Sequence, residues 1–159
     1  MIRIGQSVDI HPLKAGRDLI LGGVRISHDK GLDGHSDADV LVHAVAESIL
    51  GALALGDLGT HFPDTDPAYK GADSLLLLAH TAKLARDCGF RLSNLDATIL
   101  AEQPKMAPHI PAMRENMARV LNCDVSQISV KATRGEKLGF VGRKEGIAAV
   151  CVCLMETDR

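Results

Sequence analysis

The stretch Ile2-Arg-Ile-Gly-Gln-Ser-Val-Asp-Ile-His-Pro-Leu13 opens the chain with an apolar-flanked run that predicts a β-strand. Side chains two residues apart leave a strand by the same face. Asp9 and His11 are therefore expected to point to one side of the sheet. From there a carboxylate and an imidazole can reach one metal ion.

A second segment, His35-Ser-Asp-Ala-Asp39, predicts the beginning of a helix whose apolar stripe runs over residues 40–55. Ser36 is a natural N-cap residue, and Asp39 is then the acidic partner three residues further on. At about 100° per residue, Ser36, Asp39 and His43 lie close together on one side of such a helix. His43 is thus expected to face the same cleft as the cap.

The remaining patterns predict an α/β fold, in the form of an α+β sandwich, as a single domain over residues 1–159. Gly22-Gly23 joins two short apolar runs in the way a tight hairpin turn does. Two further helices and three further strands are expected at 73–88, 111–121, 90–101, 128–133 and 147–155. The result is one mixed, four-stranded sheet with helices on one face, plus the small hairpin. Its bare face, and the apolar strand 147–155, favour self-association.

Composition excludes several classes of protein. A net charge of −2, without any cluster of Lys and Arg among aromatic residues, argues against nucleic-acid binding. The first residues enter a strand rather than a leader peptide, and no charge-free run approaches the length of a membrane span. The four cysteines form no Cys-x-x-Cys pair and fit a reducing compartment. We expect a cytoplasmic protein without a nucleic-acid or membrane partner.

Asp9, His11 and His43 make a set of two nitrogens and one oxygen that suits Zn²⁺ with a fourth coordination position open. Asp39 is expected to orient one imidazole from behind. Taken singly, His11 can merely precede Pro12 at the end of a strand, and His43 can be an ordinary helix histidine. Because three ligands come together on two elements, we favour the metal site.

Two further segments suggest phosphate chemistry. His35 and Ser36 lie at the predicted start of a helix, whose free N–H groups form a general anion site. In Lys131-Ala-Thr-Arg-Gly-Glu-Lys137, Glu136 is a candidate Mg²⁺ ligand, because Mg²⁺ prefers one or two carboxylates plus phosphate oxygens. Alone, this segment also fits a solvated charged turn. Pro104-Lys-Met106 likewise fits either a helix-entry loop or a site that recognises a base or ribose.

In their order along the chain, these motifs resemble the 2-C-methyl-D-erythritol 2,4-cyclodiphosphate synthase family of the non-mevalonate isoprenoid pathway. The resemblance runs from about residue 2 to residue 156. The motifs that carry it are Asp9-x-His11, Gly22-Gly-Val, His35-Ser-Asp-x-Asp39 with His43, Gly56-Asp-Leu-Gly, Phe62-Pro-Asp-Thr-Asp-Pro67, Lys70-Gly-Ala-Asp-Ser74, Pro104-Lys-Met, Lys131-Ala-Thr, Glu136-Lys-Leu-Gly-Phe140 and Gly142-Arg143. It implies a CMP-releasing lyase that cyclises 4-diphosphocytidyl-2-C-methyl-D-erythritol 2-phosphate.

The resemblance also implies roles for particular residues. Asp9, His11 and His43 would bind Zn²⁺ or another divalent transition metal, and Glu136 would bind Mg²⁺ or Mn²⁺. The phosphates would be contacted by His35, Ser36 and Thr133, and the transition state would be stabilised by His35 and Arg134. The methylerythritol pocket would be formed by Asp57 and Gly59, with a flap at Phe62, Pro63, Asp64, Thr65 and Asp66, and the cytidine pocket by Ala101, Pro104, Lys105, Met106 and Ala107. A homotrimer with active sites between subunits is expected. Phe140 and Arg143 would surround a cavity on the threefold axis that can hold an isoprenoid diphosphate.

Two departures from the family pattern stand out. Arg134-Gly135 replaces a threonine and a small polar residue, so a guanidinium charge would have to replace a hydroxyl, and Ser7 stands where a glycine is common. Two other functions are compatible with the residues: a metal-dependent phosphohydrolase that activates water, and a non-catalytic trimeric module that binds metal or an isoprenoid diphosphate. Product analysis separates the first from a cyclising enzyme.

Overall fold

The computed structural model describes residues 1–63 and 65–157, so that Asp64 of the expected flap lies outside the described residues. The longer helices and strands and the hairpin follow one another in the order that the sequence patterns predict. They are β1 Ile2–Ala15, β2 Leu19–Leu21, β3 Val24–Ile26, β4 Lys30–Leu32, α1 Val40–Ala52, α2 Leu58–His61, η1 Pro67–Tyr69, α3 Ser74–Asp87, β5 Phe90–Leu100, α4 Ile110–Leu121, η2 Val125–Gln127, β6 Ile128–Thr133, α5 Gly139–Gly142 and β7 Gly146–Thr157.

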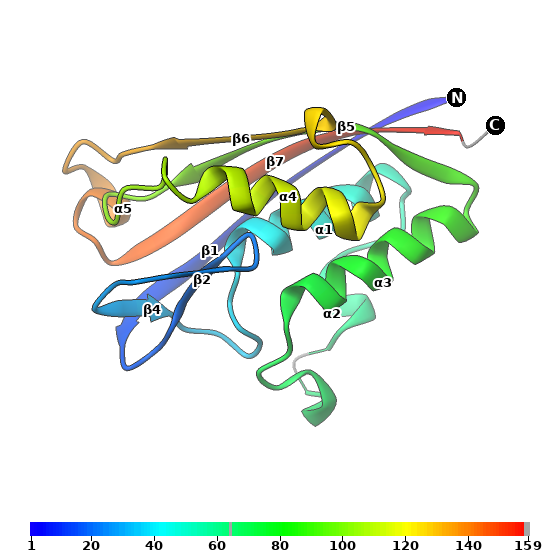
Figure 1. Cartoon of the computed structure of the whole chain (residues 1–159). Coiled ribbons are helices and arrows are strands. Elements are labelled where there is room, and N and C mark those ends of the chain that lie inside the picture. The colour runs from blue at the N-terminus through cyan, green and yellow to red at the C-terminus, as the bar shows by residue number, and fades with distance from the viewer. Residues whose placement is uncertain (64, 158–159) are drawn as a thin grey trace.

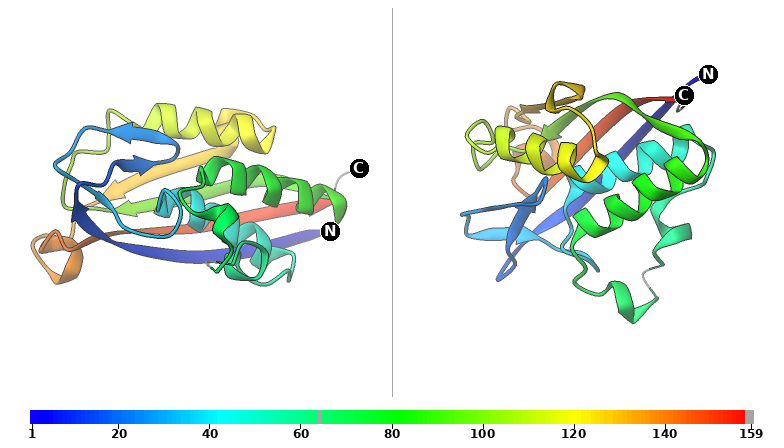
Figure 2. Two further views of the ribbon diagram at one scale, coloured as in Figure 1. Left: turned by 90° about the horizontal axis from the view of Figure 1, so that it is seen from below. Right: turned by 45° about the vertical axis from the view of Figure 1, so that its right-hand side comes forward.

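A five-stranded mixed sheet in the order β4-β1-β7-β5-β6 forms one layer of the molecule, and β2 and β3 form the predicted hairpin. β5 and β6 are parallel, and the other neighbouring strands are antiparallel. The prediction of four strands was wrong because β4 has only three residues, too few to show an alternating pattern. Figure 1 shows α1, α3 and α4 on one side of the sheet, and Figure 2 shows α3 and α4 side by side.

The two faces of the sheet differ in what covers them. Side chains of β1 alternate, so that Gly5 and Ser7 are buried toward the helices. Ile4, Val8 and Ile10 point to the opposite face, where they are 68%, 49% and 53% exposed. The β1 part of this face is therefore apolar and uncovered in the single chain, and a bare face was predicted from the patterns.

Some segments differ in detail from the sequence prediction. Helix α1 begins at Val40 and its N-cap is Asp39 rather than Ser36. The long loop expected at 57–71 contains the short helices α2 and η1. These short helices escaped prediction because neither is long enough to show a helical apolar stripe.

Asp39 joins the hairpin to α1. Its buried carboxylate accepts hydrogen bonds from the backbone N–H groups of Gly22, Gly23 and Val42, over 3.0, 2.8 and 3.0 Å. Burial raises the pKa of Asp39 to about 6, so the carboxylate is ionised at pH 7.5. The expectation that Asp39 orients an imidazole was wrong, because both its oxygens are used by the hairpin tip and the helix cap.

Helix α1 lies directly on β1. A Cβ atom at Gly5 would come within 1.8 Å of the carbonyl oxygen of Ser48, so only glycine allows this approach. Further along the strand, the Ser7 hydroxyl donates to the Glu47 carboxylate over 2.5 Å. Two residues further along β1, Asp9 lies opposite His43, which precedes Glu47 by about one turn of α1.

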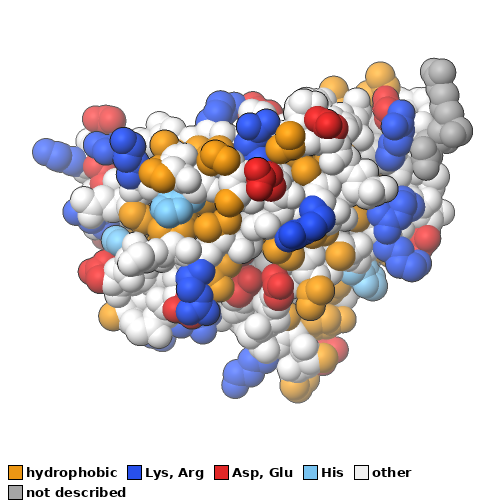
Figure 3. All heavy atoms as spheres, viewed as in Figure 1, with side chains coloured by type: hydrophobic (Ala, Val, Ile, Leu, Met, Phe, Trp, Pro, Cys, Tyr) orange, Lys and Arg blue, Asp and Glu red, His pale blue; other side chains and the backbone are white. Residues whose placement is uncertain are grey.

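No helix in residues 1–63 and 65–157 is long and apolar enough to cross a membrane. On the face shown in Figure 3, basic side chains lie among acidic and apolar ones instead of forming one basic patch.

Replacing Asp39 by alanine is expected to lower the free energy of unfolding by about 3 kcal/mol at pH 7.5, since one helix cap and two buried N–H groups lose their acceptor. Asp73→Ala is the control: Asp73 is an exposed N-cap whose carboxylate accepts from the Leu75 N–H, and the loss of this cap should cost about 1 kcal/mol. Urea unfolding followed by circular dichroism measures both. Equal losses would contradict the role given to Asp39.

Candidate metal centre

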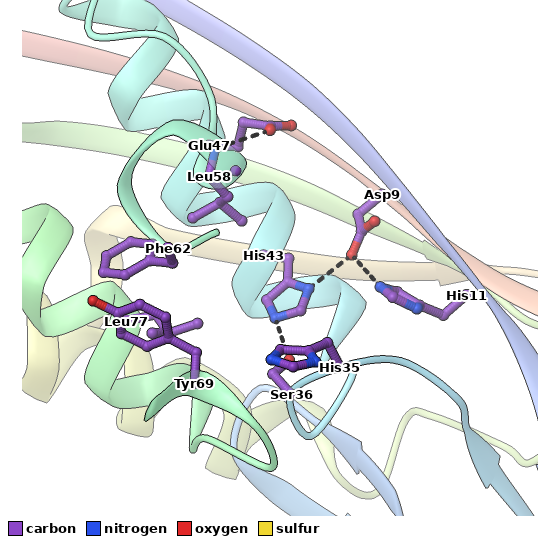
Figure 4. A pocket seen from close by; sticks show the side chains of 11 residues that line it. Asp9, His11, His35, Ser36, His43, Glu47, Leu58, Phe62, Tyr69 and Leu77 are labelled. Atoms are coloured by element: carbon purple, nitrogen blue, oxygen red, sulfur yellow. Dashed lines mark hydrogen bonds and ion pairs between the residues drawn. The ribbon is translucent and has the colours of Figure 1, made fainter. Parts of the chain in front are cut away.

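Asp9 and His11 of β1 meet His43 of α1 as the sequence predicted. One carboxylate oxygen of Asp9, Oδ2, lies 3.3 Å from His11 Nε2 and 3.0 Å from His43 Nδ1. One ligand atom of each residue lies within 4.8 Å of the other two, and within the described part of the chain this is the group that fits a metal ion. Figure 4 shows both imidazoles directed at the same carboxylate.

The rear nitrogen of each imidazole has its own partner. His11 Nδ1 lies 2.8 Å from the carbonyl oxygen of Asp33, which can only accept, so this nitrogen carries the hydrogen and Nε2 is free to bind a metal. The ring also depends on Gly34, where a Cβ atom would lie 2.7 Å from His11 Cε1. His43 Nε2 lies 2.8 Å from the Ser74 hydroxyl and 3.2 Å from the Ser36 hydroxyl.

The electrostatics of the centre favour a cation. Burial alone would raise the pKa of Asp9, but the imidazoles of His11 and His43, when they are protonated, hold it well below its usual range. The hydrogen bond with Asp9 raises the pKa of the His11 imidazole, against the opposite effect of burial. The carboxylate is therefore an anion over the whole physiological range. The two nitrogens and one oxygen fit the donor set of a catalytic zinc site.

The metal set lies at one wall of a cavity of about 310 Å³. His35, Ser36, Gly59 and Phe62, which were predicted to bind substrate, line the same cavity, while Asp57 caps α2 beside it and accepts from Thr60 over 2.9 Å. Four further residues that line this cavity were missed by the sequence prediction: Glu47, Leu58, Tyr69 and Leu77. Glu47 had a usable signal, because it follows His43 by four residues on the same helix face.

The segment after α2 folds over this cavity and partly on itself. The Phe62 ring packs edge-on against Tyr69 and His80, with ring centroids 5.4 and 5.2 Å apart. Asp66 caps η1, and its carbonyl oxygen lies 3.4 Å from His35 Nε2. Pro63 is tied to the same turn, because its carbonyl oxygen accepts from the backbone N–H of Asp66.

A second cavity, of about 210 Å³, lies where β5 and β6 end. It is lined by Ala101, Glu102, Pro104, Lys105, Met106, Ala107, Ala132, Thr133 and Arg134, and thereby brings together the residues that the sequence assigned to a nucleotide pocket. Gly135 is fixed to its rim, because its N–H donates to Glu102 over 3.0 Å.

Three predicted residues lie apart from both cavities. Glu136 is exposed in the turn before α5, with a φ of 51°. Phe140 belongs to α5, and Arg143 follows that helix and donates to Glu145 over 2.9 and 3.1 Å. Within one chain, the structure does not bring these residues to the metal set.

Comparison with known proteins places this arrangement in a family. The model of the YgbB family matches residues 2–156. The chain belongs to the YgbB family. The 2-C-methyl-D-erythritol 2,4-cyclodiphosphate synthase of Geobacter sulfurreducens is 64% identical over 98% of this chain and 99% of its own length, and that of Clostridium perfringens is 60% identical over 97% and 99%.

Solved structures of the family have the same fold. The bifunctional IspDF of Campylobacter jejuni superposes with a TM-score of 0.95 at 43% identity, over 99% of this chain and 42% of its own. The IspF protein of Plasmodium falciparum in its CDP complex gives a TM-score of 0.88 at 36% identity, over 99% and 97%. The resemblance seen in the motifs is thus confirmed over almost the whole chain.

Zinc affinity is expected to fall as the pH drops through the raised pKa of His11, because the metal must displace the proton that the imidazole then carries. Below that pKa, the zinc affinity should fall about tenfold for each pH unit. Competition with a chromophoric chelator between pH 5.5 and 8.5 measures this, with the chelator's own titration as the control. A constant affinity over this interval would contradict the assignment of His11.

Proposed function

We propose that this member of the YgbB family carries out its reaction with the residues of both cavities, in an assembly of three copies. The activity is that of a 2-C-methyl-D-erythritol 2,4-cyclodiphosphate synthase. In this reaction the 2-phosphate oxygen of the substrate attacks the β-phosphorus of its own diphosphate; a new P–O bond forms and the P–O bond to CMP breaks. Since no protein nucleophile is required, the chain has to align the two phosphates and offset their charge.

The observation that carries the proposal is the Asp9 carboxylate facing two imidazoles in the same cavity as Ser36. Asp9, His11 and His43 would hold Zn²⁺, and Glu136 would hold Mg²⁺ or Mn²⁺. When bound, these ions supply positive charge beside the phosphates. Ser36 accepts a hydrogen bond from the Ala38 N–H over 3.2 Å, and its hydroxyl hydrogen can be donated to a phosphate oxygen.

His35, beside Ser36, would contact the same phosphate, and Arg134 would supply charge to the diphosphate. Arg134 lines the second cavity next to Thr133. A guanidinium can form paired hydrogen bonds with phosphate oxygens. This residue would therefore replace, by charge, the hydroxyl that the family commonly has at its position.

The two cavities suit the two ends of the substrate. The cavity at 101–107 and Thr133 would take the cytidine diphosphate, and the one beside Asp57, Gly59 and the flap would take the methylerythritol. The CDP complexes among the similar structures support a substrate that contains cytidine diphosphate. Phe140 and Arg143 would contact an isoprenoid diphosphate on the threefold axis of the trimer.

The orientation of Thr133 supports sites between subunits. Thr133 pairs in register with Leu100. It lies three residues after Val130 in β6, and an odd step along a strand changes the face of the sheet. Because Val130 is buried on the helix-covered face, Thr133 points to the helix-free face. Asp9 and His11 point to the helix-covered face. Because one chain directs these groups to opposite faces of its sheet, a neighbouring chain would have to complete each site.

With Zn²⁺ and Mg²⁺, the purified protein should release CMP and the cyclic diphosphate from the substrate. Glu136→Gln should lower kcat on the order of 10²-fold, because a carboxylate ligand for the second cation is lost. Glu115→Gln, on the exposed side of α4, is the matched control and should keep full activity. Chromatography of the products measures both.

Two outcomes would overturn this function. Inorganic phosphate instead of the cyclic diphosphate would identify a metal-dependent phosphohydrolase. Metal binding without any turnover in the parent would identify a non-catalytic binding module.

Val8→Asp should dissociate the trimer and reduce CMP release at least tenfold, because it places a charge on the uncovered apolar face of the sheet, where Val8 pairs with Val150. Leu76→Asp is the control, since Leu76 is 67% exposed on α3. Sedimentation equilibrium measures the mass of each protein. A Val8→Asp protein that stays trimeric would exclude this face as the interface.

A further inference from the structure

The His43 ring is held from behind by a chain of two polar side chains, Ser74 and Asp37. Its Nε2 atom lies 2.8 Å from the hydroxyl oxygen of Ser74, the first residue of α3, which is fully buried. The Ser74 hydroxyl in turn donates to Asp37 Oδ1. The other oxygen of Asp37 accepts from the backbone N–H of Ser74 over 3.0 Å. A carboxylate, a hydroxyl and an imidazole thus form one line that ends at the metal centre.

The direction of the hydrogen bonds in this line determines which His43 nitrogen faces the metal centre. A hydroxyl has one hydrogen, and Ser74 gives it to Asp37, so its oxygen can only accept from His43. Nε2 therefore carries the ring hydrogen, and Nδ1 presents a lone pair to Asp9 Oδ2 at 3.0 Å. Two acceptors at this distance repel each other unless a cation lies between them.

Backbone hydrogen bonds join the residues before α3 to the residues before α1. The Gly71 N–H donates to the His35 carbonyl over 2.8 Å, and the Asp37 N–H donates to the Ala72 carbonyl over 3.1 Å. These bonds fix residues 71–74 against residues 35–37. Ser74 is thereby placed under His43 by backbone contacts that do not depend on its own side chain.

We propose that Asp37 is a positioning residue for the metal centre, acting on His43 through the Ser74 hydroxyl. The proposal rests on the metal site of the proposed function. Asp37 orients Ser74, Ser74 holds Nε2–H, and Nδ1 is kept open toward Asp9 and the cation. Asp39, two residues away, has a different role, because its partners are the hairpin and the α1 cap.

Zinc affinity of the metal-free protein tests this role. Ser74→Ala and Asp37→Asn should each raise the zinc dissociation constant about 10- to 100-fold, as the loss of an outer partner of a ligating histidine does. Asp73→Asn, the same exchange at the neighbouring cap residue, should change it less than twofold. Thermal unfolding of each metal-free protein verifies the fold. Unchanged zinc affinity in folded Ser74→Ala and Asp37→Asn would overturn the proposal.

The tautomer of His43 in the parent gives a readout that needs no variant. Nitrogen-15 NMR of the zinc-loaded protein at pH 8 should show zinc on Nδ1 and the hydrogen on Nε2, and Ser74→Ala should make this hydrogen exchange faster with water. An Nδ1–H tautomer in the parent would refute the proposal even where a variant does not fold. If the parent itself binds no zinc, the metal assignment of the proposed function fails instead.

Discussion

The structure depends on the direct packing of α1 on β1 at Gly5. Because this residue has no side chain, the helix backbone at Ser48 approaches the strand. The two elements then stay in step, with Ser7 bonded to Glu47 and Asp9 facing His43. A bulkier residue at Gly5 would push the helix outward, and His43 would move away from the two ligands on the strand. The candidate metal centre is thus a consequence of how closely a helix and a strand pack.

The turn before α1 divides its two carboxylates between separate tasks. Ala38 has a φ of 58°, in the left-handed region that non-glycine residues seldom adopt. This turn lets Asp37 reach the start of α3 while Asp39 enters the hairpin and the cap. The strained backbone of the buried Ala38 therefore lies between two carboxylates with different roles. Asp39 holds the hairpin and caps α1, and Asp37 contacts Ser74 behind His43.

Much of the fold and the metal set could be predicted from the sequence. Alternation in β1 placed Asp9 and His11 on one face, and the helical stripe placed His43 toward them. The role of Asp39 could not be predicted, because His35-Ser-Asp-Ala-Asp39 contains several residue types that cap helices and the choice depends on where the hairpin tip packs. The role of Asp37 was missed because its partner, Ser74, is distant in sequence.

Glu136, Phe140 and Arg143 illustrate another limit. Their roles came from the family resemblance alone, and one chain keeps them away from the metal set. Patterns of apolar residues report packing within a chain, whereas these residues would act across a boundary between chains. The apolar outer face of the sheet was the signal of such a boundary, but periodicity does not say which residues meet there.

In the proposed assembly, one metal ion held by Asp9, His11 and His43 lies beside a nucleotide site completed by a neighbouring chain. Anomalous X-ray scattering at the zinc edge, from crystals grown with Zn²⁺ and CDP, tests it most directly. We expect one zinc peak within bonding distance of these three side chains, with CDP in the 101–107 pocket of the adjacent subunit. A peak elsewhere, or metal and CDP held by a single isolated chain, would contradict it.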